Sequence, residues 1–134
     1  MSTFKKFEDM DVWKKAMVLT RGIYKSTNQP SFSKDYYLAN QIRKSSISIA
    51  SNIAEGVERD GNKELINFLY IAKGSCGELR CQLYIALDQN YLDRNSFKEF
   101  YNLATEISRS LIKLIKYLQE SDLKGNKYKQ RKET

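Results

Sequence analysis

The chain has 134 residues, a length typical of one domain and sufficient to bury a hydrophobic core without disulfide or metal support. Its composition, 41% hydrophobic and 29% charged, is that of a globular protein and excludes an intrinsically disordered chain. The chain contains no histidine, the commonest general base and metal ligand, and its net charge is +7.

No apolar run approaches the roughly 18 residues that a membrane span requires, and the basic start of the chain is not followed by the apolar region of a secretory signal. We therefore expect a cytoplasmic protein with no membrane association. The cysteines Cys76 and Cys81 are five residues apart. On one helix they would diverge by about 140°, so we expect both to be reduced rather than joined in a disulfide.

The spacing of the apolar residues predicts an all-α protein, in which the first helix covers about residues 9–27. Its predicted inward face repeats by three and four residues and consists of Trp13, Ala16, Met17, Thr20, Ile23 and Tyr24. The segment Asn28–Pro30 then breaks the helix.

The second helix is predicted to open with Ser33 as its N-cap and Asp35 in its first turn. Phe32, just before the cap, is predicted to pack on Tyr37 as a hydrophobic staple. The segment 56–61 should end this helix. Its inward seam is Leu38, Ile42, Ser45, Ile49 and Ile53.

The third helix is predicted over about residues 63–89, with Asp60 or Asn62 as its cap and Asn90 in the left-handed conformation after its end. Its predicted seam is Leu65, Phe68, Ala72, Ser75, Leu79, Leu83 and Ala86. The fourth helix is predicted over about residues 96–120, with the most regular seam: Phe97, Phe100, Ala104, Ile107, Leu111, Leu114 and Leu118.

Four helices with short connections predict an antiparallel, up-down-up-down four-helix bundle, which we assign to residues 1–123. Residues 124–134 carry five basic residues and one acidic residue, whereas residues 1–123 carry 18 basic and 15 acidic residues. We therefore expect the last segment to be a flexible basic tail. Such a tail can contact phosphates, but a tail that only improves solubility has the same composition.

A polar set on the second and third helices is a candidate subunit interface or polar network. Serine and asparagine are unusual on a solvated helix face, because they stabilise helices less than lysine and glutamate do. The set consists of Arg43, Ser48, Asn52, Glu55, Ser75, Glu78 and Gln82. We expect a structural network rather than an active site, because no nucleophile–base pair accompanies it. Gly74 and Gly77, inside the third helix, indicate that another backbone comes close there.

Basic residues provide the candidate nucleic-acid contacts, although an ordinary solvated face would carry the same residue types. The candidates are Lys14, Lys15, Arg21, Arg43, Lys44, Arg59, Lys63, Lys127, Lys129, Arg131 and Lys132. We predict no catalytic residues, no cofactor and no metal site. A carboxylate-bridged metal pair in a helical bundle uses Glu-x-x-His motifs, which a chain without histidine cannot supply.

The segment 48–56, Ser-Ile-Ala-Ser-Asn-Ile-Ala-Glu-Gly, resembles the signature of the four-helix-bundle proteins encoded in intervening sequences of 23S rRNA genes. The opening Phe7-Glu8-Asp9 with Val12-Trp13-Lys14, and the third-helix residues from Phe68 to Leu83, are similar to that family too. Two positions differ: Ala50 stands where the family has proline, and Asn90 where it has glycine.

This resemblance implies a bundle that assembles as a homopentamer. It also implies a relation to the accessory variability protein of diversity-generating retroelements, which binds a reverse transcriptase and nucleic acid. The leading hypothesis is a non-enzymatic oligomer that binds RNA or DNA electrostatically, as an adaptor for a reverse transcriptase or an rRNA-associated element. The alternative is a protein–protein interaction module that binds no nucleic acid.

Overall fold

The computed structural model describes the backbone of residues 6–133 and the side chains of residues 6–125. A 3-10 helix, η1 (Phe7–Asp9), precedes α1 (Asp11–Thr27), and the single-turn helix α2 (Pro30–Ser33) leads into α3 (Tyr36–Glu58). The helices α4 (Asn62–Asp88) and α5 (Arg94–Glu133) complete the chain. Residues 6–133 contain no strand, so the predicted all-α class is confirmed.

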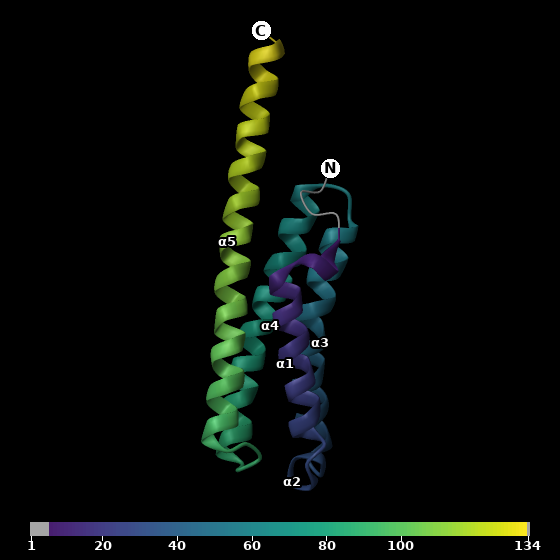
Figure 1. Cartoon of the computed structure of the whole chain (residues 1–134), viewed down its shortest axis with the longest axis vertical. Helices are drawn as coiled ribbons and strands as arrows, with labels where there is room; N and C mark the ends of the chain where they lie inside the picture. Colours follow the sequence, from purple (N-terminus) through teal and green to yellow (C-terminus); the bar gives the residue numbers. More distant parts are fainter. Residues whose placement is uncertain (1–5, 134) are drawn as a thin grey trace.

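The four long helices form a bundle in which neighbours in the chain run in opposite directions (Figure 1). The order around the bundle is α1, α3, α4 and α5, and α5 closes the ring against α1. Each long helix therefore packs against two others, and the connections between consecutive helices are short, as an up-down-up-down topology requires.

The core lies on the axis of the bundle, and the seam predicted for α3 is confirmed at all five positions, Leu38, Ile42, Ser45, Ile49 and Ile53. The seam predicted for α5 is confirmed in part. Its buried residues include Phe100, Ala104, Ile107, Leu111 and Leu118. Phe97 and Leu114 are half-buried at the edges of the seam, and Ile115 is fully buried. Among the described residues, none of the helices is both long and apolar enough to span a membrane.

The inward face predicted for α1 is partly wrong. Ala16 and Ile23 are buried as expected, but Tyr24 is exposed and Trp13 and Met17 are only half-buried at the border with α3. The residues that complete the core face are Val12, Leu19 and Thr27. The buried face of α1 is therefore centred about one residue, roughly 100°, away from the row that contains Trp13, Met17 and Tyr24.

The predicted start of the second long helix is also wrong. Ser33 belongs to α2, and Asp35 is the N-cap of α3, where its carboxylate accepts a hydrogen bond of 3.0 Å from the Leu38 amide. The predicted staple does not form, because the ring of Phe32 stacks on Tyr91 with centroids 5.1 Å apart and Tyr37 is exposed. Phe32 therefore links α2 to the turn after α4.

The turns around α4 use the backbone freedom of two residues. Gly61, rather than Asp60 or Asn62, is the N-cap of α4, with a φ of 118° that side chains strongly disfavour. At the other end, Asn90 has the predicted left-handed conformation, with a φ of 62°. The segment 56–61 ends α3 as predicted, because the helix stops at Glu58.

The last helix is longer than predicted. Instead of ending near Glu120, α5 continues as helix to Glu133, through the segment expected to be a tail, and stands well beyond the other helices (Figure 1). The candidate contacts Lys127, Lys129, Arg131 and Lys132 lie on this extension, and their side chains are outside the described residues.

Candidate nucleic-acid and subunit interfaces

Three members of the predicted polar set meet where α3 packs on α4. The hydroxyl oxygens of Ser48 and Ser75 are 2.8 Å apart, so the two helices share a hydrogen bond. Asn52 donates to the hydroxyl oxygen of Ser48 at 3.0 Å and to its carbonyl oxygen at 2.8 Å. Each hydroxyl is thus satisfied within the chain, which suits a structural contact better than a reactive centre.

Two members of the set lie elsewhere. Arg43 faces α1, where it donates to the Thr27 hydroxyl at 2.7 Å and to the Asn28 side-chain oxygen at 2.8 Å, with its guanidinium over the Tyr24 ring. Glu55 accepts a 3.1 Å hydrogen bond from Arg59 on the same helix. Neither side chain contributes to the Ser48–Ser75 contact.

Gln82 carries a polar atom that no partner satisfies within the described part of the chain. Its side chain is 9% exposed, and its amide nitrogen donates weakly to Glu78 at 3.4 Å. The Oε1 atom of Gln82 has no hydrogen-bond partner. A buried acceptor of this kind costs about 1–3 kcal/mol unless a donor reaches it.

Gly74 and Gly77 do not mark a close approach of helices within the chain, contrary to expectation. A Cβ built on Gly74 would meet no atom within 4 Å, and one on Gly77 would lie 3.8 Å from the Arg80 side chain. Gly22 and Gly56 mark the close contacts instead. A Cβ on Gly56 would be 2.8 Å from Phe68 Cβ.

Gly74 belongs to a row of exposed residues on α4 that the sequence pattern did not predict. On the side of α4 away from the core, five exposed residues alternate by three and four positions, as residues in a helix–helix seam do. We call this row the outer stripe of α4: Ile71, Gly74, Glu78, Cys81 and Ile85. Ile71 and Ile85 are 51% and 44% exposed, so the stripe presents apolar side chains on either side of Glu78 that no residue of the described part of the chain covers.

Several predicted cation contacts are already engaged within the bundle. The Lys15 ammonium pairs with Glu106 at 2.6 Å. Arg59 contacts Glu55 at 3.1 Å and lies over the Phe68 ring. The remaining described candidates are exposed on three different helices: Lys14 and Arg21 on α1, Lys44 on α3 and Lys63 on α4.

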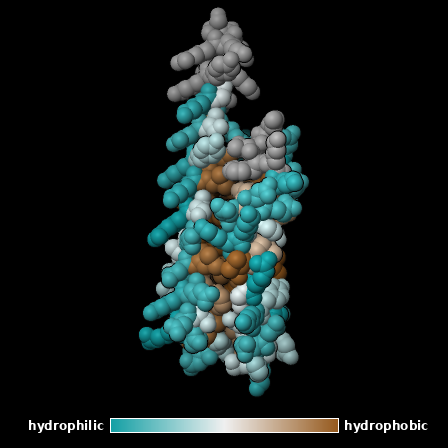
Figure 2. Space-filling model, in the orientation of Figure 1, coloured by the Kyte–Doolittle hydropathy of each residue, from teal (hydrophilic) through white to brown (hydrophobic). Residues whose placement is uncertain are grey.

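A denser group of exposed cations lies on α5, on a face that also carries the exposed Glu120. The solvent-facing side of α5 carries six exposed cations, none of which forms an ion pair within the described part of the chain: Arg94, Lys98, Arg109, Lys113, Lys116 and Lys124. We call these residues the α5 basic face. Hydrophilic side chains project in a row along this edge of the molecule (Figure 2).

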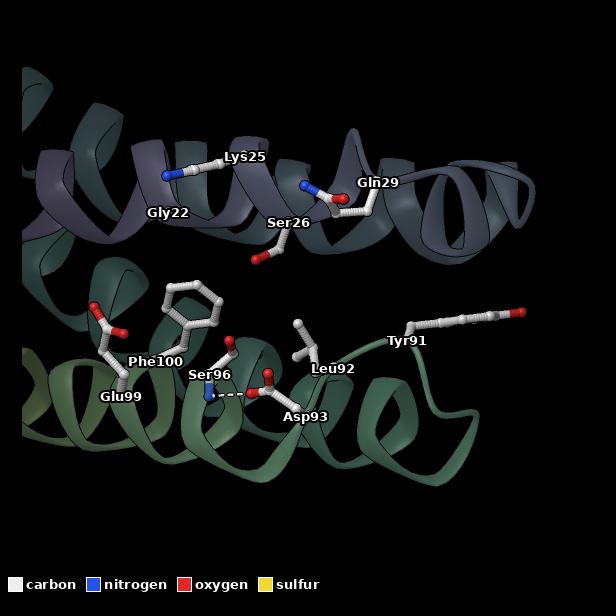
Figure 3. A pocket seen from close by; sticks show the side chains of 10 residues that line it. All are labelled: Gly22, Lys25, Ser26, Gln29, Tyr91, Leu92, Asp93, Ser96, Glu99 and Phe100. Atoms are coloured by element: carbon white, nitrogen blue, oxygen red, sulfur yellow. Dashed lines mark hydrogen bonds between the residues drawn. The ribbon is translucent and has the colours of Figure 1, made fainter.

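A cleft of about 490 Å³ opens between the end of α1 and the start of α5. Figure 3 shows the side chains that line it: Gly22, Lys25, Ser26, Gln29, Tyr91, Leu92, Asp93, Ser96, Glu99 and Phe100. The Asp93 carboxylate accepts a 2.7 Å hydrogen bond from the Ser96 amide, which lowers the pKa of that carboxyl below its ordinary value. Asp93 therefore caps α5, a structural role.

The fold and these surfaces define a helical-bundle protein that presents a basic face and an exposed apolar stripe. Among the described residues, no group of acidic, histidine and cysteine side chains could hold a metal ion. The sequence profile of the 23S rRNA-intervening sequence protein family matches residues 8–113. The chain belongs to this family, which confirms the resemblance seen in the sequence.

A solved structure supports the same assignment. The chain is similar to a protein of unknown function from the S23 ribosomal protein family of Bacteroides thetaiotaomicron, with a TM-score of 0.72 and 29% identity. The similarity covers 78% of this chain and 98% of the other. A comparison with curated proteins found no match.

Proposed function

We propose that this protein is a non-enzymatic, homo-oligomeric bundle that binds nucleic acid electrostatically. The observation that carries the proposal is the α5 basic face, a row of exposed cations without acidic partners. A cation can neutralise a phosphate fully only if no carboxylate already does so, and each such contact releases a counterion from the nucleic acid.

The expected contact set therefore changes from the one read in the sequence. Lys15, Arg43 and Arg59 are held by partners within the bundle and are poorly placed to contribute. Lys14 and Arg21 are exposed on α1, the helix beside α5, and can extend the basic surface. The affinity should then depend mainly on α5, with a smaller part from α1.

The outer stripe of α4 supports the homo-oligomer. Exposed isoleucines flank a glycine that no contact within the chain requires, and glycine in a helix interior costs about 1 kcal/mol relative to alanine. A helix from a second copy of the chain that packs on the stripe would bury Ile71 and Ile85. Family resemblance suggests a pentamer and an adaptor role toward a reverse transcriptase or an rRNA-associated element.

Binding is tested by fluorescence anisotropy with labelled RNA and DNA between about 50 and 200 mM salt. The triple variant Arg109→Ala/Lys113→Ala/Lys116→Ala should weaken binding strongly and reduce the slope of log affinity against log salt by about 3. The matched control, Lys34→Ala/Lys44→Ala/Lys63→Ala, removes the same charge from exposed positions off the face. Equal losses in both variants, or no binding at low salt, would contradict the proposal.

The alternative, a protein-interaction module without nucleic acid, is favoured by the outer stripe of α4 alone. The variant Ile71→Asp/Ile85→Asp should reduce the mass measured by light scattering toward the 15.7 kDa of one chain. If the wild-type protein is oligomeric through this stripe but binds neither RNA nor DNA, the alternative replaces the leading proposal.

A further inference from the structure

The end of α5 projects beyond the other helices of the bundle (Figure 1). Near the point where it leaves the bundle, Asp122 accepts a 3.1 Å hydrogen bond from Asn62, the first residue of α4. Leu118 is fully buried, but Leu123 is 56% exposed, and a Cβ on Gly125 would meet no atom within 4 Å. Beyond this point α5 continues as helix to Glu133 and stands alone (Figure 1).

An isolated helix of this length is marginal in water, because short helices gain little without tertiary packing. Gly125 weakens it further, since glycine disfavours the helical backbone. The sequence from 124 to 133 contains five basic residues and one acidic residue, and Tyr128 is its only large apolar residue. A partner that stabilises this segment must therefore be polyanionic rather than apolar.

The shape of the segment selects among polyanions. An α-helix with its side chains is about 10–12 Å across, and the major groove of B-form DNA, about 12 Å wide, admits it. The major groove of A-form RNA is too narrow for this. Single strands are usually held by aromatic stacking, but Tyr117 is the only strongly exposed aromatic residue described along the outer half of α5.

We propose that the projecting end of α5, residues 123–133, inserts into the major groove of double-stranded DNA. Lys113, Lys116 and Lys124 of the α5 basic face would then contact phosphates beside the groove. Binding supplies phosphates that pair with the basic residues of the segment, so the DNA stabilises the helix. This inference rests on the proposed function and specifies its nucleic acid.

The first experiment compares ligands of one sequence: a DNA duplex of about 24 base pairs, roughly two helical turns, the corresponding RNA duplex, and single-stranded DNA. Fluorescence anisotropy at one salt concentration should show the DNA duplex bound at least about tenfold more tightly than either competitor, a difference expected when only one groove admits the helix. Equal or tighter binding of the RNA duplex or of the single strand would overturn the inference.

The second experiment changes the backbone of the projecting helix without changing its charge. Gly125→Ala should raise affinity for the DNA duplex by up to about fivefold, because it favours the helix before binding. Gly125→Pro should weaken binding, because proline interrupts the helix. Gly125→Ala should not lower the melting temperature of the bundle, since a Cβ at residue 125 would meet no atom of the described part of the chain within 4 Å. If both variants bind like the wild type, the segment acts as a charged chain and the inference is wrong.

Nucleic-acid binding and groove insertion are distinguished by different results. If no nucleic acid binds, the proposed function itself is wrong. If the triple variant on α5 loses binding while both Gly125 variants behave as wild type, the proposed function stands and only groove insertion fails. As a further readout, the far-ultraviolet circular dichroism of the protein should gain helical signal on addition of the DNA duplex, and an unchanged signal would count against insertion.

Discussion

The ring of Phe100 packs directly against the backbone of Gly22, so closely that a Cβ on residue 22 would lie 2.5 Å from Phe100 Cε1. Phe100 is 7% exposed, and this contact brings α5 against α1 beside the cleft that both helices line. The absence of a side chain at position 22 is therefore a condition for closing the bundle on this side.

Substitution of Gly22 by alanine should destabilise the protein. The new methyl group must displace the Phe100 ring, and overpacking of this kind costs about 1–3 kcal/mol, more than the gain in helix propensity of about 1 kcal/mol. Urea denaturation measures the free energy of unfolding.

Gly77→Ala is the matched control, because its Cβ would lie no closer than 3.8 Å to the Arg80 side chain. It should be as stable as the wild type or slightly more stable. In the Gly22→Ala background, Phe100→Leu should recover part of the loss. If Gly22→Ala were as stable as Gly77→Ala, the Phe100 contact would not have the importance given to it.

The glycines show what sequence alone can and cannot decide. Gly74 and Gly77 were expected to mark a close approach, but Gly22 and Gly56 do so. A glycine inside a helix indicates that another helix can come close at that position. The local sequence does not specify how that other helix is rotated or offset, so it does not show which glycine makes the contact. The same limitation explains the error in the predicted face of α1. A row of residues that includes Trp13 and an adjacent row that includes Leu19 have the same spacing, so the sequence does not show which row faces the core.

The seam of α3 was predictable because its residues, from Leu38 to Ile53, repeat by three and four positions, and all five are buried. The same kind of spacing placed Ser48 and Ser75 in one polar set, and the structure joins their hydroxyls. The α5 basic face was missed because lysine and arginine are ordinary on solvated helix faces. Only the structure shows that Lys15 is paired with Glu106 and that Lys113 is not paired with an acidic residue.

Asp35 connects two parts of the fold, and its removal should cost stability. One carboxylate oxygen caps α3 at the Leu38 amide, and the other accepts a hydrogen bond of 3.1 Å from the Tyr91 hydroxyl. Asp35→Ala should lower the free energy of unfolding by about 1 kcal/mol for the cap, and more if the Tyr91 hydroxyl is left unpaired. Asp35→Asn, which keeps an acceptor oxygen for the cap and places an amide group that can donate to the Tyr91 hydroxyl oxygen, should lose clearly less. Equal losses in thermal denaturation would show that the hydrogen bonds are not the cause.

Acid should weaken the protein in part through Asp93. The Ser96 amide lowers the pKa of Asp93 below the ordinary 3.8, so the folded state favours the charged form. The contribution to stability is therefore present above pH 3.8 and disappears as the pH falls through the lower folded-state pKa. Asp93→Asn keeps a capping residue that does not titrate. The melting temperatures of wild type and variant should thus differ most near neutral pH and converge in acid, and a constant difference would contradict this assignment.

The two cysteines should react very differently with a thiol reagent. Burial raises the pKa of Cys76 to about 12, so at pH 8 almost none of it is the reactive thiolate, and the core shields it from the reagent. Cys81 is exposed on the outer stripe of α4. In the native chain, Ellman's reagent should titrate one thiol quickly, and in denaturant it should titrate both. Cys81→Ser should abolish the fast phase, and Cys76→Ser should leave it intact.

If the proposed oligomer covers the outer stripe of α4, the fast phase should become slower as the protein concentration rises. Rapid labelling of Cys76 in the native protein would instead show that α4 is turned differently in the bundle.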